Sequence, residues 1–502
     1  MSYIEKYDRT SPKSIEEYAK KLIGYTFEDI IELNKKDSKE LNKGEIKENT
    51  SLYYGNRSRK GGLGNLLEEI YFGYNANSIS EPDFPEAGVE LKITPFEKKK
   101  NGSFKAGERL VLGMISYDKE IEDNLYDSHI WNKCKLLLLI YYLRDKRIKD
   151  NLLYTIRYAT LFQPTEADLK IIEQDYKIIV DKIKAGKAHE LSESDTMYLG
   201  ACTKGSTAEK SLVKQYYNTN VKAKKRAFCY KNTYMTFILN NYIIPNKNTY
   251  EENVEPIIRD VDDLKNCSFD EYIKSKINKN IGKTDEELCL LFDREYNNNK
   301  AQWIDLSYRM LGIKSNKAEE FIKANIVVKA VRIEENGNMV ESSSLPTICF
   351  KELVKQEWED SDLFKYFETT KFLFVVYKKQ GEHYVLKGCK LWNMPYEDLN
   401  VDLYQGWKNI RDTVEKGTEL EKKETKNGII IKNNLPNKNA NRIIHIRPHT
   451  SKTFYKFEDG EIFGKGTYVN GDELPDGRWM TKQSFWINNS YIISQLQDII
   501  NQ

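Results

Sequence analysis

The order of apolar and polar residues predicts strands and helices that alternate along the chain. The run LLLLIYYL at 136–143 has the length of a strand buried on both faces, and GVELKITPF at 88–96 has the alternation of a half-buried strand. The stretches 168–187 and 402–417 carry apolar residues three and four apart and close near a glycine, which is typical of helices. This mixture predicts an α/β fold of the α+β kind, with mixed sheets.

Several of these patterns return in the same order later in the chain. SIEEY at 14–18, which predicts a helix that opens with a serine N-cap, returns as SFDEY at 268–272. GVELKITPF has a counterpart in IVVKAVRI at 326–333, and KLLLLIYYL has one in KFLFVVYKK. An ordered recurrence over so long a distance indicates that the same fold is present twice.

The repeat sets the predicted domain boundaries. The first copy covers residues 1–245, and the second covers residues 265–502. Between them, residues 246–264 are polar and rich in turn-forming residues, which is typical of a linker. With 502 residues the chain is long enough for two domains with a core each.

Composition and charge leave the class of partner open. The chain has 78 Lys and Arg against 76 Asp and Glu, a net charge of +2, so only local patches can indicate a nucleic-acid partner. The abundance of Lys, Asn, Ile and Tyr would fit nucleic-acid binding, but an AT-rich genome produces the same bias. The seven cysteines show no CxxC spacing, which argues against a zinc site or a disulfide framework and predicts a reducing, cytoplasmic location.

Membrane and ATP partners are not predicted. The N-terminal residues MSYIEKYDRTSPKS are charged and lack the apolar core of a signal peptide. No apolar run approaches the roughly 18 residues that span a membrane. The GxxxxGK[ST] phosphate loop is also absent from the sequence, so ATP use is not indicated.

Candidate chemistry is concentrated in EPDFPEAGVELKITPF at 81–96. Residues two apart lie on the same face of a strand, so Glu90 and Lys92 project together. A turn at Pro85 can bring Asp83 close to both. Two adjacent carboxylates repel each other unless a cation lies between them, and Mg²⁺ prefers carboxylate and water oxygens. Because a neighbouring lysine can orient a water or stabilise charge on a phosphate, this set is suited to phosphodiester hydrolysis.

A second interpretation of this pattern stays open. Acidic and basic residues at this spacing recur by chance in so charged a chain, and a surface strand with a salt bridge would look the same. The preceding segment KGGLGNLLEEIYFG at 60–73 favours the catalytic interpretation. It places Glu68 on an amphipathic helix, where a third carboxylate could complete a metal site with Asp83 and Glu90.

Five segments resemble the MutH family of endonucleases, which share the PD-(D/E)xK nuclease fold. In chain order they are KGGLGNLLE, DFPEAGVELKITPF, ERLVLGMISY, SHIWNKCK and RAFCYKNTYMTFIL. Over its full length, and in EAGVELK and GKAHELS, the chain resembles the Sau-three-A restriction endonucleases, which cut unmodified duplex DNA at GATC. The resemblance implies a PD-(D/E)xK fold that is present twice, with a degenerate second copy.

The resemblance also implies roles for the residues of the first copy. Asp83, Glu90 and Lys92 match the catalytic positions of the family. Glu68 matches an accessory carboxylate, so that Asp83, Glu90 and Glu68 are expected to lie around Mg²⁺. Lys135, in SHIWNKCK, falls on a family lysine near the active site.

DNA contacts are expected from basic residues of the first copy. The base-reading elements of the family correspond to the loop CTKGST and the strand RAFCYKNTY. A tyrosine of the nicking enzyme is replaced by Cys229, so the way in which adenine methylation is sensed does not carry over. The residues expected to meet phosphates or base edges are Lys60, Lys133, Lys204, Arg226 and Lys231.

The second copy lacks the central carboxylate but keeps basic residues. Opposite Glu68, Asp83, Glu90 and Lys92 stand Ser307, Glu320, Val327 and Lys329. The basic residues of its closing segments HIRPHTSK and TKQ are Arg447, His449, Lys452 and Lys482. These features predict a catalytically empty domain that binds DNA as an effector, with a scaffold carrying solvated charges as the alternative.

Together the sequence predicts a type II restriction endonuclease. The expected reaction is Mg²⁺-dependent hydrolysis of both strands of double-stranded DNA at GATC, leaving 5′-phosphates, with the C-terminal domain as an allosteric effector. One active site per chain implies that two chains meet on the site as a transient homodimer. Two alternatives stay open: a MutH-like strand-nicking repair endonuclease, and a non-catalytic DNA-binding regulator in which EAGVELK is structural.

Overall fold

Two compact units make up the chain. The computed structural model describes residues 7–40, 62–74, 81–145, 147–205, 211–247, 267–297, 299, 301–313, 319–340, 343–426 and 428–501. The first unit is Met1–Phe269 together with Glu319–Asn325, and the second is Asp270–Ala318 together with Ile326–Gln502. The predicted linker 246–264 lies outside the described residues from residue 248 onward.

The first unit combines helices with short and long strands. Its helices are α1 (Pro12–Lys20), α2 (Phe27–Glu40), α4 (Gly62–Leu66), α5 (Glu166–Lys184) and α6 (Asn232–Ile238), with the π-helical turns η1 (Leu67–Phe72) and η8 (Leu239–Ile243). Its strands are β1 (Glu90–Lys98), β2 (Phe104–Ala106), β3 (Leu110–Met114), β4 (Leu137–Leu143), β5 (Thr155–Phe162), β6 (Leu199–Thr203), β7 (Leu212–Val213), β8 (Ala223–Lys224) and β9 (Arg226–Tyr230).

The main sheet of the first unit has the strand order β2-β1-β4-β5. β1 runs parallel to β4, with Glu90 beside Leu137, whereas β2 and β5 are antiparallel to their neighbours. The residues Leu137–Ile140 have no exposed surface, which confirms the buried strand that their apolar run predicts. This mixed sheet, together with the helices, confirms the predicted α/β class.

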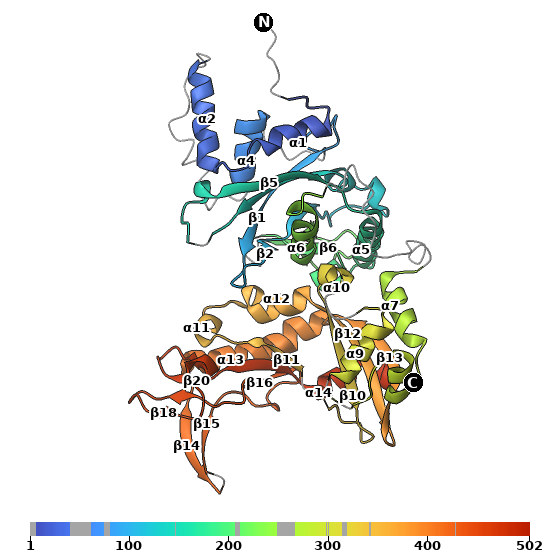
Figure 1. The fold of residues 1–502 in the computed structure, drawn as a ribbon, viewed down its shortest axis with the longest axis vertical. Helices are drawn as coiled ribbons and strands as arrows, with labels where there is room; N and C mark the ends of the chain where they lie inside the picture. The colour runs from blue at the N-terminus through green and yellow to red at the C-terminus, as the bar shows by residue number, and fades with distance from the viewer. Residues whose placement is uncertain are drawn as a thin grey trace. The chain divides into compact units, whose positions relative to one another are not determined.

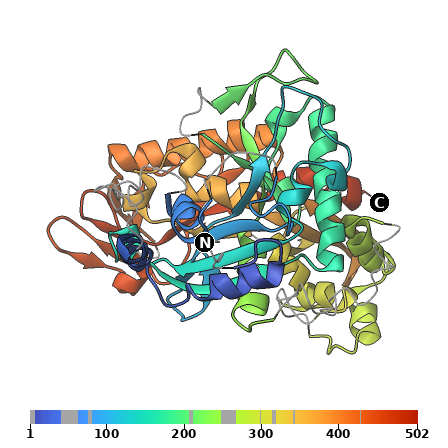
Figure 2. The ribbon, with the colours of Figure 1, turned by 90° about the horizontal axis from the view of Figure 1, so that it is seen from above.

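Helices pack against this sheet. α1, α2, α4 and η1 share a hydrophobic core with the apolar residues on one face of β1 and β4, among them Leu91 and Leu138. Figures 1 and 2 show α1 lying along the strands and α2 projecting from them. Helix α1 begins at Pro12 and not at the expected serine of SIEEY, because the Ser11 side chain accepts a hydrogen bond from the Ser14 N–H and Pro12 suits the first helical position.

A second, smaller sheet of the first unit has the antiparallel order β3-β9-β6. All five residues of β9, the segment Arg226–Tyr230, are buried. The chain leaves β9 directly into α6, and α6 packs against β2. The small sheet is thereby tied to the edge of the main sheet.

The second unit repeats this mixture. Its helices are α7 (Phe269–Asn278), α8 (Asp285–Leu291), α9 (Gln302–Met310), α11 (Phe350–Leu353), α12 (Asp362–Thr369), α13 (Tyr404–Lys416), α14 (Asn489–Gln495) and α15 (Gln497–Ile500). Its strands are β10 (Ile326–Ile333), β11 (Ser343–Thr347), β12 (Lys371–Gln380), β13 (His383–Trp392), β14 (Leu420–Thr425), β15 (Gly428–Asn433), β16 (Ile444–Pro448), β17 (Tyr455–Lys456), β18 (Ile462–Phe463), β19 (Gly471–Glu473), β20 (Trp479–Thr481) and β21 (Gln483–Ile487).

Two three-stranded sheets organise the second unit. One has the order β10-β12-β13, with β10 parallel to β12 and β13 antiparallel; the other has the antiparallel order β11-β21-β16. Residues from both sheets and from α12 and α13 form one hydrophobic core. The hairpin β14-β15 projects from this unit (Figure 1).

One short helix departs from the predicted boundaries. Helix α10 (Glu319–Ala324) comes from the second half of the chain but belongs to the first unit, where it packs against α6. The chain continues from α10 through Asn325 into β10 of the second unit. No helix within the described ranges is long and apolar enough to cross a membrane.

Candidate active site

The turn before β1 explains the spacing between Asp83 and Glu90. Phe84 and Val89 exchange backbone hydrogen bonds of 2.9 and 3.2 Å, which folds the chain back on itself. Asp83 therefore lies beside the start of β1, where its Oδ2 accepts a hydrogen bond of 2.9 Å from the Leu91 N–H. The Asp83 N–H donates to Oε2 of Glu90 at 3.3 Å. Two carboxylates that are seven residues apart in sequence are thus neighbours.

Gly88 allows this turn to form. Its N–H donates to the Pro85 carbonyl at 3.2 Å, and its φ of +65° lies in the left-handed region that L side chains rarely adopt. A Cβ at this position would also lie 3.4 Å from Cε of Lys135. The backbone conformation therefore favours glycine between the two carboxylates, and a Cβ at this position would contact the Lys135 side chain.

Two lysines converge on Glu90. Nζ of Lys92 lies 2.6 Å from Oε1 of Glu90, and Nζ of Lys133 lies 3.5 Å from the same oxygen. The Glu90 side chain is only 2% exposed, and a buried carboxylate is costly unless positive charge compensates it. Lys133, which the resemblance assigns to a phosphate, is therefore also a partner of Glu90.

The carboxylates carry more negative charge than these lysines compensate. Burial, reinforced by the negative charges of Asp83 and Glu90, raises the pKa of Glu68 from 4.5 to about 7. Burial and the charge of Glu90 raise the pKa of Asp83 from 3.8 to about 6, against the attraction of Lys92. Glu68 is thus electrostatically part of the cluster, although it comes from η1 and not from the strand.

Lys135 lies in a cavity next to this cluster. The cavity has a volume of about 340 Å³, and its walls include Gly88, Trp131, Lys135 and Leu169. The Glu90 N–H donates at 3.0 Å to the carbonyl of Leu136, the residue that follows Lys135. The pairing of β1 with β4 therefore brings Lys135 beside the turn that precedes β1, and its part in the active site stays a prediction.

The donor set fits a hard divalent cation without being arranged as a finished metal site. Among the residues that the structure describes, no three or more Asp, Glu, His or Cys side chains are gathered closely enough to hold a metal ion. Asp83 and Glu90 are nevertheless adjacent, and the raised pKa values of Asp83 and Glu68 reflect negative charge that a cation would compensate. The ligand set Asp83, Glu90 and Glu68 stays a prediction.

Comparison with known proteins agrees with this geometry. The family model of the DNA mismatch repair enzyme MutH matches residues 72–175, which contain the turn, β1 and β4. The type II restriction enzyme Sau3AI of Staphylococcus aureus is 36% identical over 473 residues, which cover 88% of this chain and 94% of that enzyme. The chain belongs to the Sau3AI family of type II restriction enzymes. The resemblance that the sequence motifs indicated is thereby confirmed.

Two basic residues expected to contact DNA in this Sau3AI-family chain are placed in the interior. Arg226 is 6% exposed and donates to the Ala201 carbonyl at 2.6 Å. Lys231 is 2% exposed and donates to the Thr196 carbonyl at 2.5 Å. We correct their assignment, because groups enclosed in this way stabilise the small sheet and do not reach a DNA surface.

The remaining basic residues of the first unit differ in placement. Lys204 follows β6, is partly exposed, and its N–H donates to the Lys225 carbonyl at 2.8 Å. A DNA contact by Lys204 stays a prediction. Lys60 lies outside the described residues.

The central strand of the second unit forms without a carboxylate pair. Val327 lies in β10 beside Phe372 of β12, in a parallel pairing like that of Glu90 with Leu137. Lys329 follows two residues later on the same strand. The strand geometry of the first unit is thus present where Val327 replaces an acidic residue.

The other aligned positions of the second copy lie on two helices, of which α9 packs against β10. Ser307 is fully buried in α9, and its hydroxyl donates to the Trp303 carbonyl at 2.7 Å. Glu320 lies in α10, which belongs to the first unit. The alignment of Glu320 with Asp83 is therefore corrected, because the segment before β10 is a helix that packs elsewhere and not a turn beside the strand.

The basic residues of the second unit gather along β16 and β21. Arg447 is exposed, with its guanidinium 4.5 Å from the centre of the Trp486 ring. His449 is also exposed; its Nδ1 lies 2.9 Å from the Ser484 hydroxyl, and its N–H donates to the Lys482 carbonyl at 2.9 Å. Lys452 is exposed in the following loop. This placement is compatible with a DNA-facing surface, and the contact itself stays a prediction.

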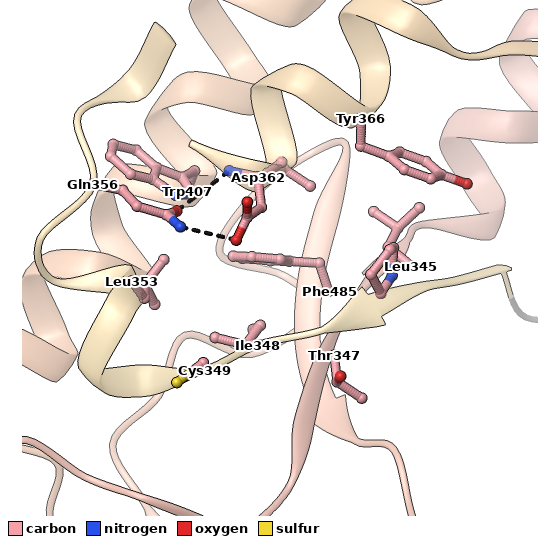
Figure 3. A pocket seen from close by; sticks show the side chains of 12 residues that line it. Leu345, Thr347, Ile348, Cys349, Leu353, Gln356, Asp362, Tyr366, Trp407 and Phe485 are labelled. Carbon is pink, nitrogen blue, oxygen red and sulfur yellow. Dashed lines mark hydrogen bonds between the residues drawn. The ribbon is translucent and has the colours of Figure 1, made fainter. Parts of the chain in front are cut away.

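A pocket in the second unit offers no second active site. It encloses about 60 Å³, and most of the side chains around it are apolar, among them Leu345, Trp407 and Phe485 (Figure 3). Its one acidic lining residue, Asp362, accepts a hydrogen bond of 2.9 Å from the Gln356 side chain. A single, paired carboxylate in an apolar pocket does not provide the donors for metal-assisted hydrolysis.

Sequence reasoning missed two features near the site. The contact of Lys133 with Glu90 joins residues 43 positions apart, and only the parallel pairing of β1 with β4 brings them together. Trp131, a wall of the cavity beside Lys135, was not singled out. Its position in the segment that leads into a buried strand was the available signal, since binding residues are disproportionately found in connecting segments.

Proposed function

We propose that this chain hydrolyses both strands of unmodified double-stranded DNA at GATC, with Mg²⁺ as cofactor, and leaves 5′-phosphate ends. The observation that carries the proposal is the adjacency of Asp83 and Glu90 at the start of β1, with Lys92 2.6 Å from Glu90. Membership of the Sau3AI family of type II restriction enzymes supports it. The recognition sequence follows from the family resemblance of the sequence motifs.

Each residue of the cluster has a proposed part in hydrolysis. Asp83 and Glu90 would hold the cation, with Glu68 as an accessory carboxylate. A bound Mg²⁺ supplies positive charge that stabilises the scissile phosphate and acidifies a nearby water. Lys92 orients the attacking water, because its ammonium is fixed beside Glu90. In-line attack breaks the bond between phosphorus and the 3′ oxygen, which leaves the phosphate on the 5′ end.

Two further lysines are suited to phosphate contacts. The ammonium of Lys133 contacts the same Glu90 oxygen as that of Lys92, and Lys135 lines the adjacent cavity. A phosphate drawn toward the cluster would meet both ammonium groups. Because the described part of the chain contains one such cluster, cleavage of both strands requires two chains on the site, at least as a transient homodimer.

We further propose that the second unit is a degenerate copy of the PD-(D/E)xK fold that binds a second DNA duplex as an effector. The strand pairings support this. β10, β12 and β13 repeat the parallel and antiparallel pairing of β1, β4 and β5, and the order β11-β21-β16 repeats the order β3-β9-β6 in sequence position. The exposed Arg447 and His449, with Lys482, would form its DNA surface.

Plasmid cleavage tests the proposed reaction. In Mg²⁺, the unchanged chain is expected to convert supercoiled plasmid with GATC sites to linear fragments. Glu90→Ala is expected to lower the cleavage rate at least 1,000-fold while DNA binding persists, because the cation loses a ligand and Lys92 its partner. Glu86→Ala removes an exposed acid from the same turn and serves as the matched control. Undiminished cleavage by Glu90→Ala would refute the catalytic assignment.

A MutH-like nicking activity is the second candidate. The match of the MutH family model to residues 72–175 favours it. The same plasmid assay separates the two activities: a nicking enzyme converts supercoiled DNA to open circles and stops there. Action on cellular DNA would also require the cytoplasmic location that the sequence predicts.

A further inference from the structure

A lysine from the second half of the chain is buried inside the first unit. Lys323, in α10, places its Nζ 2.6 Å from Oδ1 of Asp168 at the start of α5, and their side chains are 5% and 3% exposed. The ammonium also lies 4.4 Å from the ring centre of Phe237 and 5.5 Å from that of Tyr198. Lys323 thus occupies a cage made of one carboxylate and two aromatic rings.

Further hydrogen bonds define this cage. The Thr233 hydroxyl donates to the Lys323 carbonyl at 2.9 Å, and the Tyr234 hydroxyl donates to Oδ2 of Asp168 at 3.0 Å. A buried ion pair gains little stability over an apolar pair, since both charges lose their hydration. The charged pair instead specifies one docked position for α10, because any other position would leave Asp168 buried without its cation.

Two routes of direct contact lead from the cage toward the proposed active site. Asp168 is followed by Leu169, which lines the cavity that contains Lys135. On the other route, Tyr234 packs edge-on against Tyr230 with ring centres 5.3 Å apart. The Tyr230 hydroxyl donates to the carbonyl of Cys134, which lies between Lys133 and Lys135 in the sequence, at 3.3 Å.

We propose that α10 is a clasp through which the second half of the chain sets the position of Lys133 and Lys135, with Lys323 as its positioning residue. The chain runs from α10 through Asn325 directly into β10, so the backbone joins the proposed clasp to the second unit. The proposal rests on the proposed function, because it is cleavage that gives these two lysines a role. It adds a physical link by which the second unit can act on the reaction.

A double variant tests the clasp in the full-length chain. Lys323→Met with Asp168→Asn removes the ion pair without leaving a buried charge unpaired. Thermal midpoint, affinity for a GATC duplex and single-turnover cleavage rate at saturating DNA are measured. We expect a midpoint close to that of the unchanged chain, a duplex affinity within about twofold, and a cleavage rate at least tenfold lower. Lys177→Met, on the exposed ion pair of α5 with Asp181, is the control and leaves all three unchanged.

The possible outcomes separate the clasp from the proposed function. The clasp is overturned if the double variant cleaves at the rate of the unchanged chain. It is also overturned if the cleavage rate of the double variant falls only in proportion to the fraction of the protein that is folded. Glu90→Ala is measured in the same assay. If Glu90→Ala still cleaves, the proposed function fails; if it does not cleave while the double variant cleaves normally, only the clasp fails. The single variant Lys323→Met is expected to be less stable than the double variant, because it leaves Asp168 unpaired.

Discussion

At the scale of single residues, the site contains charge that the strand itself does not require. Glu90 is 1% exposed in the first unit, whereas Val327 occupies a comparable place on β10 and that strand forms with the same parallel pairing. A buried carboxylate with two lysine partners gives little net stability compared with an apolar residue. Its presence therefore supports the proposed catalytic role of Glu90.

The raised pKa of Glu68 predicts a pH-dependent effect on stability. Folding raises the pKa of Glu68 from 4.5 to about 7. Between these two pH values the folded state binds more protons than the unfolded state, so the free energy of unfolding falls as the pH rises from about 4.5 to 7. Glu68→Gln removes the charge. We expect it to stabilise the Mg²⁺-free protein at pH 8 by about 1 kcal/mol, a value reduced for solvent screening of this half-buried group.

Thermal unfolding in EDTA at pH 8 and pH 5 checks this effect. The stabilisation by Glu68→Gln should be several-fold smaller at pH 5, where Glu68 is mostly protonated in the folded protein. Glu86→Gln, in the exposed part of the turn, should change the midpoint at neither pH. Equal midpoints for Glu68→Gln and the unchanged chain at pH 8 would show that the carboxylates are not crowded as described.

Gly88 predicts a separable effect on catalysis. Gly88→Ala adds a Cβ at a positive φ of +65° and 3.4 Å from Cε of Lys135. We expect a loss of about 1 kcal/mol of stability from the backbone and a several-fold slower cleavage from displacement of Lys135. Gly102→Ala has a φ of +86° but no atom within 4 Å of its Cβ, so it should lose similar stability and cleave normally. Equal cleavage by both variants would contradict the role of Lys135.

At the scale of elements, the sequence predicted the strands and helices but not which charges they would bury. Apolar runs identified β4 and α5, because burial on both faces or on one helical face leaves a periodic pattern. The sequence pattern could not show that Arg226 and Lys231 point inward, since their burial depends on how β9 pairs with β6. The Lys323 cage could not be predicted either, because it joins residues 155 positions apart.

The buried position of Lys231 predicts a loss of stability where the family resemblance suggested a loss of DNA affinity. Lys231 donates to the Thr196 carbonyl and attracts the fully buried Asp175, whose pKa burial raises to about 6. Lys231→Met should therefore cost roughly 3 kcal/mol of stability at pH 8, and less at pH 5, where Asp175 is protonated. Thermal or denaturant unfolding at both pH values measures this difference.

Lys204→Met is the matched control for Lys231. Lys204 is partly exposed at the end of β6, so its loss should leave the unfolding midpoint unchanged. It should instead weaken duplex binding and reduce the salt dependence of log K by about one. If Lys204→Met unfolds more readily than Lys231→Met, then Lys204 is the residue that stabilises the fold, which contradicts the roles assigned to Lys204 and Lys231.

At the scale of the whole molecule, the second unit forms its central strand β10 without a carboxylate pair, and its exposed basic edge predicts regulation by DNA. If that unit binds an effector duplex, an uncleavable GATC oligonucleotide in trans should change the rate of plasmid cleavage. Coupling between two sites is typically worth a factor of 5 to about 150. We expect an increase at the low end of this range, because the proposed coupling runs through one short helix, α10.

Replacing the basic edge should remove this response and leave the basal reaction intact. Arg447→Ala with His449→Ala deletes two exposed groups of β16 and its loop, far in sequence from the cluster around Glu90. The trans oligonucleotide should then no longer change the cleavage rate, while cleavage without it stays within about twofold. Lys351→Ala, on an exposed salt bridge of the same unit, is the control and should respond fully. An undiminished response in the double variant would mean that effector DNA binds elsewhere, and no response in the unchanged chain would leave the second unit a scaffold.

Because the clasp acts after effector binding, the variant Lys323→Met with Asp168→Asn should still bind the oligonucleotide, and its cleavage rate should not change when the oligonucleotide is added.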